Sequence, residues 1–169
     1  MANASTNDSS STHAQHFVAF FAQFEDFSYD PSQSVAGEFK RLQKTTEWKK
    51  GINRGEALVN YKLALVLQFN ETYGTNQNDL ASWQNLCRAL GVDDVPDTLS
   101  ACKKIVKGTH VNLVDLVDMP NTKQPAQHFE DVAALRKYSK KNKKIFPRDE
   151  AKAGGILRHL LRPILGGYN

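Results

Sequence analysis

The sequence has few of the residues on which several protein classes depend. Two cysteines in 169 residues cannot cross-link a small secreted scaffold or supply a four-cysteine zinc site. Ten glycines and six prolines are too few for a collagen-like or low-complexity chain. We therefore expect an ordinary globular protein in which Cys87 and Cys102 are reduced, buried thiols.

Long hydrophobic runs and targeting signals are also absent. The apolar stretch at residues 17–27 is interrupted by polar side chains, and the longest apolar run elsewhere covers residues 63–67. Both are shorter than the about 20 residues that cross a bilayer. Residues 1–12 lack the basic and apolar regions of a secretory signal. We predict a disordered leader over residues 1–12, no transmembrane segment, and an intracellular protein of the nucleus or cytoplasm.

Motifs of the common enzyme classes are missing. The chain has no glycine-rich phosphate loop, no His-Glu-x-x-His helix, no Cys-x-x-Cys pair and no Gly-x-Ser-x-Gly elbow. Asp115 and Asp118 are three residues apart, as paired carboxylates on a helix would be, but this spacing is more typical of a solvated face. We predict no catalytic residue, no metal site and no cofactor.

The hydrophobic pattern that is present is helical. Phenylalanines at positions 17, 20, 21, 24 and 27 lie on one face of a helix predicted over residues 13–26. This helix is expected to end before Pro31, because the residue that precedes a proline avoids helical geometry. The same reasoning predicts further helices over residues 32–48, 53–73, 80–90, 97–108, 129–138 and 149–161.

Residues 110–119 fit two structures. Val111, Leu113, Asp115 and Val117 alternate as in a strand, whereas Leu113 and Leu116 have helical spacing. We predict a short helix, since no second strand is available for pairing. The predicted fold class is therefore all-α, a single compact bundle of six to eight helices over residues 13–169, with the helices at 17–27, 58–73 and 80–90 forming the core.

Positive charge is concentrated near the C-terminal end. Residues 1–122 hold 11 Lys or Arg and 14 Asp or Glu, whereas residues 123–169 hold 11 and 4. Such a cluster can neutralise phosphates, contact an acidic protein or an anionic membrane, act as a nuclear import signal, or simply form a solvated loop. The candidate site residues are Arg136, Lys137, Lys140, Lys141, Lys143, Lys144, Arg148, Lys152, Arg158 and Arg162.

These charges favour a non-enzymatic binding or regulatory module. We predict that the basic segment 136–165 contacts nucleic acid or another acidic partner. The alternative is a structural or scaffolding protein whose exposed apolar residues bind a partner or a second copy of the chain, without nucleic acid. Residues 156–165 form a cationic amphipathic segment, which we expect to pack on its own domain rather than on a membrane surface.

Short motifs of structural residues are spread over most of the chain. They are Phe24-x-x-Phe27-x-Tyr29-Asp30-Pro31, Glu38-Phe39-x-Arg41-Leu42, Trp48, Trp83-x-x-Leu86-Cys87, Cys102-Lys103-Lys104, Val111-Asn112-Leu113-x-Asp115-Leu116, Ile145-Phe146-Pro147 and Ala151-Lys152-x-Gly154-Gly155. Over residues 17–165 this pattern resembles a group of small uncharacterised proteins of filamentous fungi. The resemblance implies a fungal intracellular protein, and it transfers no activity because none is assigned to the group.

Overall fold

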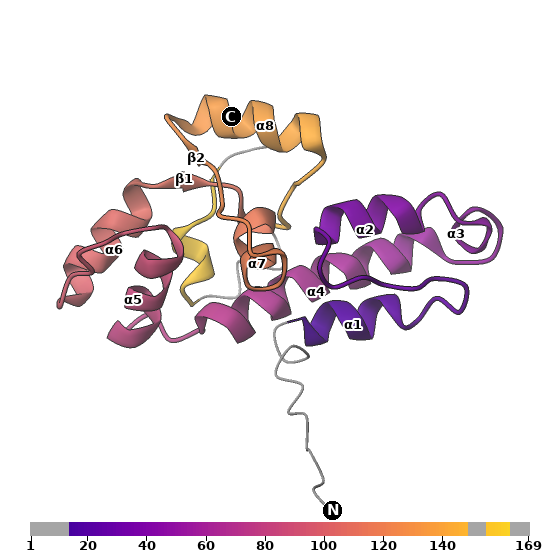
Figure 1. The fold of residues 1–169 in the computed structure, drawn as a ribbon, viewed down its shortest axis with the longest axis horizontal. Coiled ribbons are helices and arrows are strands. Elements are labelled where there is room, and N and C mark those ends of the chain that lie inside the picture. Colours follow the sequence, from indigo (N-terminus) through magenta and orange to yellow (C-terminus); the bar gives the residue numbers. More distant parts are fainter. Residues whose placement is uncertain (1–13, 149–154, 163–169) are drawn as a thin grey trace, which may run out of the picture.

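The protein is built almost entirely from α-helices, as predicted (Figure 1). The computed structural model describes residues 14–148 and 155–162. Within these residues the elements are α1 (Gln15–Phe21), α2 (Val35–Leu42), α3 (Thr46–Lys50), α4 (Arg54–Tyr73), α5 (Leu80–Ala89), α6 (Leu99–Gly108), β1 (His110–Val111), α7 (Leu113–Thr122), β2 (His128–Phe129), α8 (Val132–Asn142) and a 3₁₀ helix (Leu157–His159). The predicted leader at residues 1–12 lies outside the described residues.

Side-chain caps explain where most helices begin. In seven of the eight α-helices that the structure describes, the residue before the helix accepts a hydrogen bond from a backbone N–H of the first turn. These N-cap residues are Ser34, Thr45, Asn53, Asp79, Thr98, Asn112 and Asp131. The single helix predicted over residues 32–48 is two helices, α2 and α3. The cap at Thr45 begins the second of them.

The long helix α4 runs along the molecule and connects its two ends. Figure 1 shows α1, α2 and α3 at one end of α4, α5 and α6 at the other, and α7 with α8 above the middle. The predicted helix at 13–26 ends earlier than expected, at Phe21, but successive turns still bury Phe24 and Phe27. An aromatic cluster therefore fills the space among α1, α2 and α4, with Phe39 stacked on Tyr61 at a centroid distance of 3.9 Å.

The segment at residues 110–122 combines a strand and a helix. His110 and Val111 pair antiparallel with Phe129 and His128, so the second strand that the sequence analysis did not find lies 18 residues further on. The helix α7 then continues through Pro120 to Thr122. A proline in a helix leaves the carbonyl four residues earlier without its N–H partner, and here the Tyr73 hydroxyl donates to that carbonyl, Leu116 O, at 2.7 Å.

The described part of residues 149–161 does not form the α-helix that the sequence predicts. Residues 149–154 lie outside the described residues, and residues 155–162 contain only the 3₁₀ helix. Gly155 has a φ of +75°, and a Cβ there would lie 2.6 Å from Thr75 O, so only glycine fits. From this tight turn Ile156, Leu157 and Leu160 enter the core. The described part of the amphipathic segment, residues 156–162, therefore packs on its own domain, as expected.

Candidate functional site

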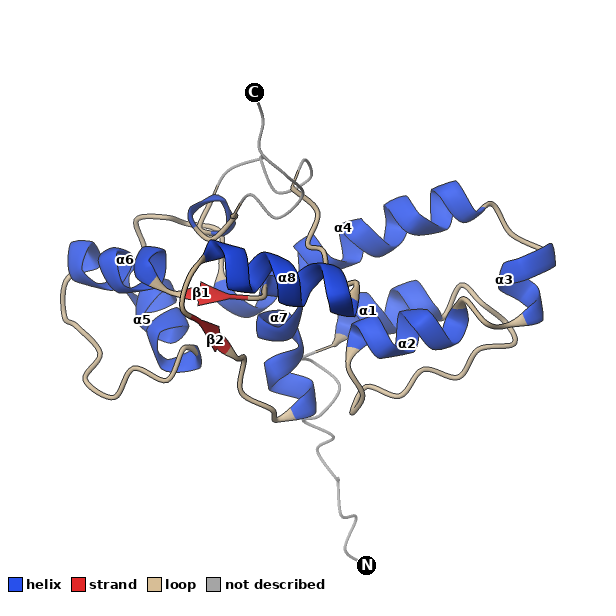
Figure 2. Cartoon of the chain, turned by 90° about the horizontal axis from the view of Figure 1, so that it is seen from above, coloured by secondary structure: helices blue, strands red, loops and turns tan. Residues whose placement is uncertain are grey.

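The helix α8 presents a row of lysines to solvent. Lys137, Lys140 and Lys141 are exposed and lie at i, i+3 and i+4 on the helix, opposite the buried Leu135 and Ser139. The structure thus brings three of the predicted site residues onto one face. Figure 2 shows α8 lying across the strand pair and α7.

Lys144, by contrast, is occupied inside the fold. Its Nζ lies 2.6 Å from Asp115 Oδ1 and 3.2 Å from the Tyr138 hydroxyl, which itself donates to Asp115 Oδ2 at 2.7 Å. Burial opposes the charge on Lys144, but these hydrogen bonds outweigh burial and raise its pKa. Since its charge is already paired, Lys144 fixes the loop after α8 and is less available to a partner than the sequence suggested.

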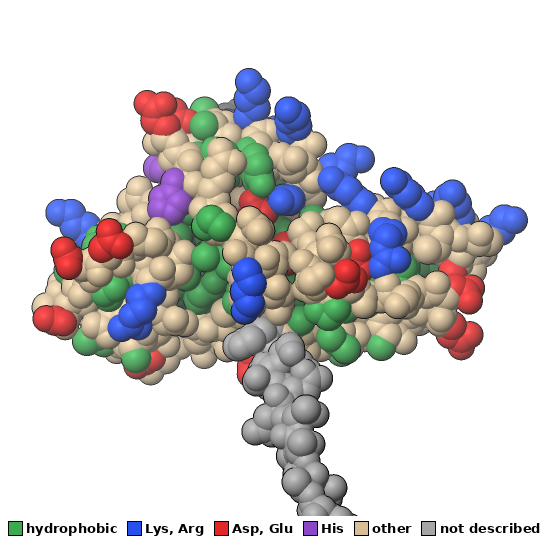
Figure 3. Space-filling model, in the orientation of Figure 1, with side chains coloured by type: hydrophobic (Ala, Val, Ile, Leu, Met, Phe, Trp, Pro, Cys, Tyr) green, Lys and Arg blue, Asp and Glu red, His purple; other side chains and the backbone are tan. Residues whose placement is uncertain are grey.

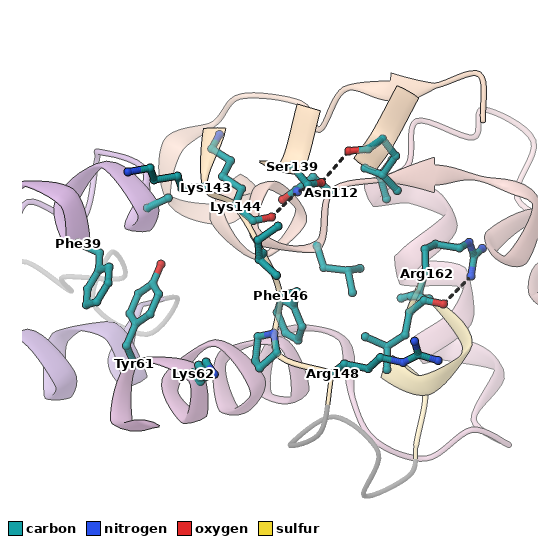
Figure 4. Close-up of a pocket in the computed structure, with 18 of the residues that line it drawn as sticks. Phe39, Tyr61, Lys62, Asn112, Ser139, Lys143, Lys144, Phe146, Arg148 and Arg162 are labelled. Carbon is teal, nitrogen blue, oxygen red and sulfur yellow. Dashed lines mark hydrogen bonds between the residues drawn. The ribbon is translucent and has the colours of Figure 1, made fainter. Parts of the chain in front are cut away.

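A buried asparagine holds the same loop from the other side. Asn112 Nδ2 donates to Ser139 Oγ at 2.9 Å and to Lys144 O at 2.8 Å, while Asn112 Oδ1 caps α7. Asn112, seen with Ser139 and Lys144 in Figure 4, and Asp115 thus anchor α8 and Lys144 to α7. Asp115 is half-buried and Asp118 buried, so the expectation that both carboxylates lie on a solvated face was wrong, because each accepts hydrogen bonds from another element.

The other predicted site residues do not join α8 in one cluster. Arg158 donates to Gln77 Oε1 at 2.5 Å, and Arg162 donates to the carbonyl oxygens of His159 and Lys107. Arg136 is half-buried and engaged with neighbouring groups, and Arg148 also has a partner. Lys152 lies outside the described residues. The nine predicted positions that the structure describes are therefore divided between α8, the loop that follows it and the C-terminal segment.

Basic residues from the first half of the chain extend the α8 face. Lys40 Nζ donates to Asn142 O at the end of α8 at 2.9 Å, which places α2 beside α8. Residues 40–54 contain six Lys or Arg and a single Glu, but a charge count over residues 1–122 conceals this local excess. Figure 3 shows Lys and Arg side chains along the edge of the molecule from α8 over α2 and α3. A count of charged residues over short segments of the sequence would have found these residues.

A groove of about 490 Å³ opens beside the end of α8, between α2, α4 and the C-terminal segment. Its floor is apolar and is formed by Ala36, Phe39, Leu58, Tyr61, Val111, Leu113, Leu135, Ile145, Phe146, Pro147, Leu160 and Leu161. Its polar lining is formed by Lys40, Gln43, Lys62, Asn112, Ser139, Lys143, Lys144, Arg148 and Arg162. Leu58 begins the 58–73 segment that was predicted to form part of the core, yet it is 42% exposed and lines this groove.

Charge of one sign surrounds this groove. Among the described residues, six Lys or Arg side chains line it and no Asp or Glu does. Lys62 on α4 and Lys143 after α8 stand on opposite sides of the apolar floor (Figure 4). The groove can therefore accept a negatively charged group more readily than a positive one.

Reactive groups elsewhere are poorly suited to catalysis. Burial raises the pKa of Cys87 to about 11, so its thiol is protonated at neutral pH and is a weak nucleophile. Both cysteines are buried and unpaired, as expected. No group of three His, Cys, Asp or Glu side chains able to hold a metal is found in the part of the chain that the structure describes.

Comparison with known proteins adds no assignment: no protein-family model, curated protein or solved structure matches this chain. Across residues 14–148 and 155–162, no helix is both long and apolar enough to span a bilayer.

Proposed function

We propose that this protein is an intracellular binding or regulatory module that contacts an acidic partner, with nucleic acid as the first candidate. The contact is made by Lys137, Lys140 and Lys141 of α8 together with Lys40 of α2 and Lys44, two residues after the end of α2. We call these five lysines the basic surface. The observation that carries the proposal is the contact of Lys40 with the end of α8, because it joins two separate basic segments.

The geometry of the basic surface suits a polyanion. Exposed lysines on adjoining helices can each approach a different phosphate and release its condensed counterions. Lysine ammonium groups carry no planar fork for reading bases, so this surface would bind phosphates without strong sequence preference. A nuclear or cytoplasmic location and a fungal source are part of this proposal.

The test is binding of labelled single- and double-stranded DNA and RNA across a salt series. The variant Lys137→Glu/Lys140→Glu reverses two charges on the exposed face of α8. We expect binding that weakens with salt, and a log–log salt slope reduced by about 2 in the variant, since each phosphate contact contributes about 0.9.

A matched control is available on α6. Lys104 and Lys107 are also exposed on a helix, so Lys104→Glu/Lys107→Glu makes the same change in net charge at another place. Affinity that falls equally in both variants would reflect net charge alone and would contradict a defined surface. Absence of binding at low salt would exclude nucleic acid as the partner.

A second candidate function is self-association, favoured by an exposed apolar stripe on α4. Val59, Leu63 and Leu67 lie at i, i+4 and i+8 and are 56%, 45% and 39% exposed. A stripe along one helix can face its own copy across a twofold axis, as isologous dimers require. Sedimentation at several concentrations tests this, with Leu63→Glu as the variant. A dimer that resists salt and is lost in the variant would support it, and a monomer at all concentrations would exclude it.

A further inference from the structure

The groove beside α8 has the size and floor of a small-molecule site, separate from the exposed lysines of α8. Its volume of about 490 Å³ falls within the about 300–1,000 Å³ of ligand pockets. Phe39, Tyr61 and Phe146 contribute aromatic surface to it. A floor of this kind favours an apolar ligand body, because burial removes hydrocarbon from water.

The hydroxyl of Tyr61 is a polar group on this apolar floor. Tyr61 as a residue is only 8% exposed, and its hydroxyl, which makes no hydrogen bond to the described residues, is open to the groove rather than fully buried. Figure 4 shows the hydroxyl pointing from α4 into the groove, toward the side that carries Lys143. Burial, with the nearby carboxylate of Asp118, keeps the pKa of Tyr61 above its ordinary value. The hydroxyl is therefore a neutral donor that a bound acceptor would satisfy.

The rim supplies the charge that such an acceptor needs. Lys62 and Lys143 line the groove, and neither makes an ion pair in the described residues. Lys40 lines it too and reaches the carbonyl end of α8. The N-terminus of α7 lines the groove through Asn112 and Leu113, but Asn112 Oδ1 already accepts from the Val114 and Asp115 N–H groups that could otherwise hold a phosphate. The neighbouring end of α8 is its negative C-terminal end, so a singly charged head group fits better than a doubly charged one.

We propose that this groove binds a small amphipathic carboxylate, with its hydrocarbon body on the floor and its carboxylate between the Tyr61 hydroxyl and the lysines of the rim. This site goes beyond the contact with a polyanion proposed above. The assignment rests on the volume, the apolar floor, the Tyr61 hydroxyl that makes no hydrogen bond within the described residues, and a described lining that carries cations and no carboxylate.

Isothermal titration calorimetry with ten-carbon probes tests the proposal, each probe kept below its micelle concentration. We expect decanoate to bind with one-to-one stoichiometry. Decanol, which lacks the charge, should bind at least about tenfold more weakly, since a charge-assisted hydrogen bond is lost. Decyltrimethylammonium should not bind. Decanol that binds as tightly as decanoate, decyl phosphate that binds more tightly, or no binding of decanoate at millimolar concentration would each overturn the assignment.

Two variants locate the site. Tyr61→Phe removes only the hydroxyl and keeps the ring stacked on Phe39, and we expect it to weaken decanoate by about two- to tenfold. Lys62→Glu should weaken it by about tenfold or more through repulsion. Lys104→Glu on α6 is the control and should leave affinity unchanged. Thermal unfolding of each variant verifies that it is folded. Decanoate affinity that neither Tyr61→Phe nor Lys62→Glu alters would place the ligand elsewhere.

The same titration separates this proposal from the preceding one. Lys137→Glu/Lys140→Glu should weaken oligonucleotide binding and retain decanoate binding, because these lysines do not line the groove. A variant that binds oligonucleotide less well but binds decanoate as wild type does would show that the ligand site is separate from the basic surface. An oligonucleotide that displaces decanoate would instead show that the groove is part of the nucleic-acid surface. That result would overturn its assignment as a small-ligand site.

Discussion

The helices α1 and α8 are both attached to the body of the protein, but by different forces. Phe17, Phe20 and Phe21 of α1 are almost fully buried in a continuous apolar core. The buried residues of α8 are only Leu135 and Ser139, and Leu135 is not part of that core. Hydrogen bonds from Asn112 and the Asp115–Lys144 ion pair hold α8 and its following loop instead.

This difference explains how α8 can carry so much charge. Few of its positions are needed for packing, so exposed lysines can occupy the rest of the helix without loss of core. The polar anchor also has geometric requirements that an apolar contact lacks, since each hydrogen bond fixes a distance and a direction. The loop that follows α8 is thereby held where its residues line the groove.

The largest effect should come from breaking the aromatic attachment of α1. Phe20 is 2% exposed and contacts the rings of Phe21, Phe24, Phe39 and Tyr61 at centroid distances of 5.0–6.1 Å. We expect Phe20→Ala to lower the free energy of unfolding by about 3–5 kcal/mol, because it removes buried ring surface and leaves a cavity. Denaturation in urea measures this, and Phe20→Leu should lose much less. A loss equal to that of an exposed phenylalanine would contradict the role of α1 in the core.

Breaking the polar attachment of α8 should have the next largest effect. Asn112→Ala removes a helix cap and two hydrogen bonds to the α8 region, and we expect a loss of about 2–3 kcal/mol in the free energy of unfolding. Asn53→Ala is the matched control, since Asn53 caps α4 from an exposed position, and it should lose only about 1 kcal/mol. Hydrogen exchange should show α8 opening in the first variant alone. Equal losses in the two variants would mean that the cross-links of Asn112 contribute nothing.

The smallest effect should come from Asp118, which ties α7 to α2. Both of its carboxylate oxygens accept from Val35 N–H, at 3.0 and 3.2 Å. Burial raises the pKa of Asp118 to about 7, although the Val35 hydrogen bond and Lys144 oppose the shift and Asp115 adds to it. Tyr29 and Tyr61 also face this carboxylate.

A raised acid pKa makes the folded state bind the proton more tightly than the unfolded state. This contribution to stability is therefore present at low pH and is lost as the pH rises from about 4 to about 7. Asp118→Asn should remove that dependence while keeping an acceptor for Val35. We expect the variant to gain on the order of 1 kcal/mol relative to wild type between pH 5 and pH 8, measured by denaturation at each pH. Parallel pH profiles for the two proteins would show that Asp118 is ionised throughout.

The sequence determined the helices because their signals are local. For α4 these signals follow one another along the chain: the cap at Asn53, the apolar period of the helix and then Gly74. The helix α4 begins and ends where they predict. The phenylalanine spacing likewise identified the buried face of the first helix, although α1 ends at Phe21. Sequence periodicity reports such features directly because each depends on neighbours within one or two helical turns.

The candidate site depended on contacts that no local pattern records. Lys40 meets Asn142 across 102 residues, and Asn112 meets Lys144 across 32. The basic segment was recognised from its composition, but the pairing of Lys144, the addition of α2 and the groove with Tyr61 were not. Hydrogen bonds and charge pairs between distant residues have no period along the chain, so only the tertiary structure decides which lysines are paired and which are presented to a partner.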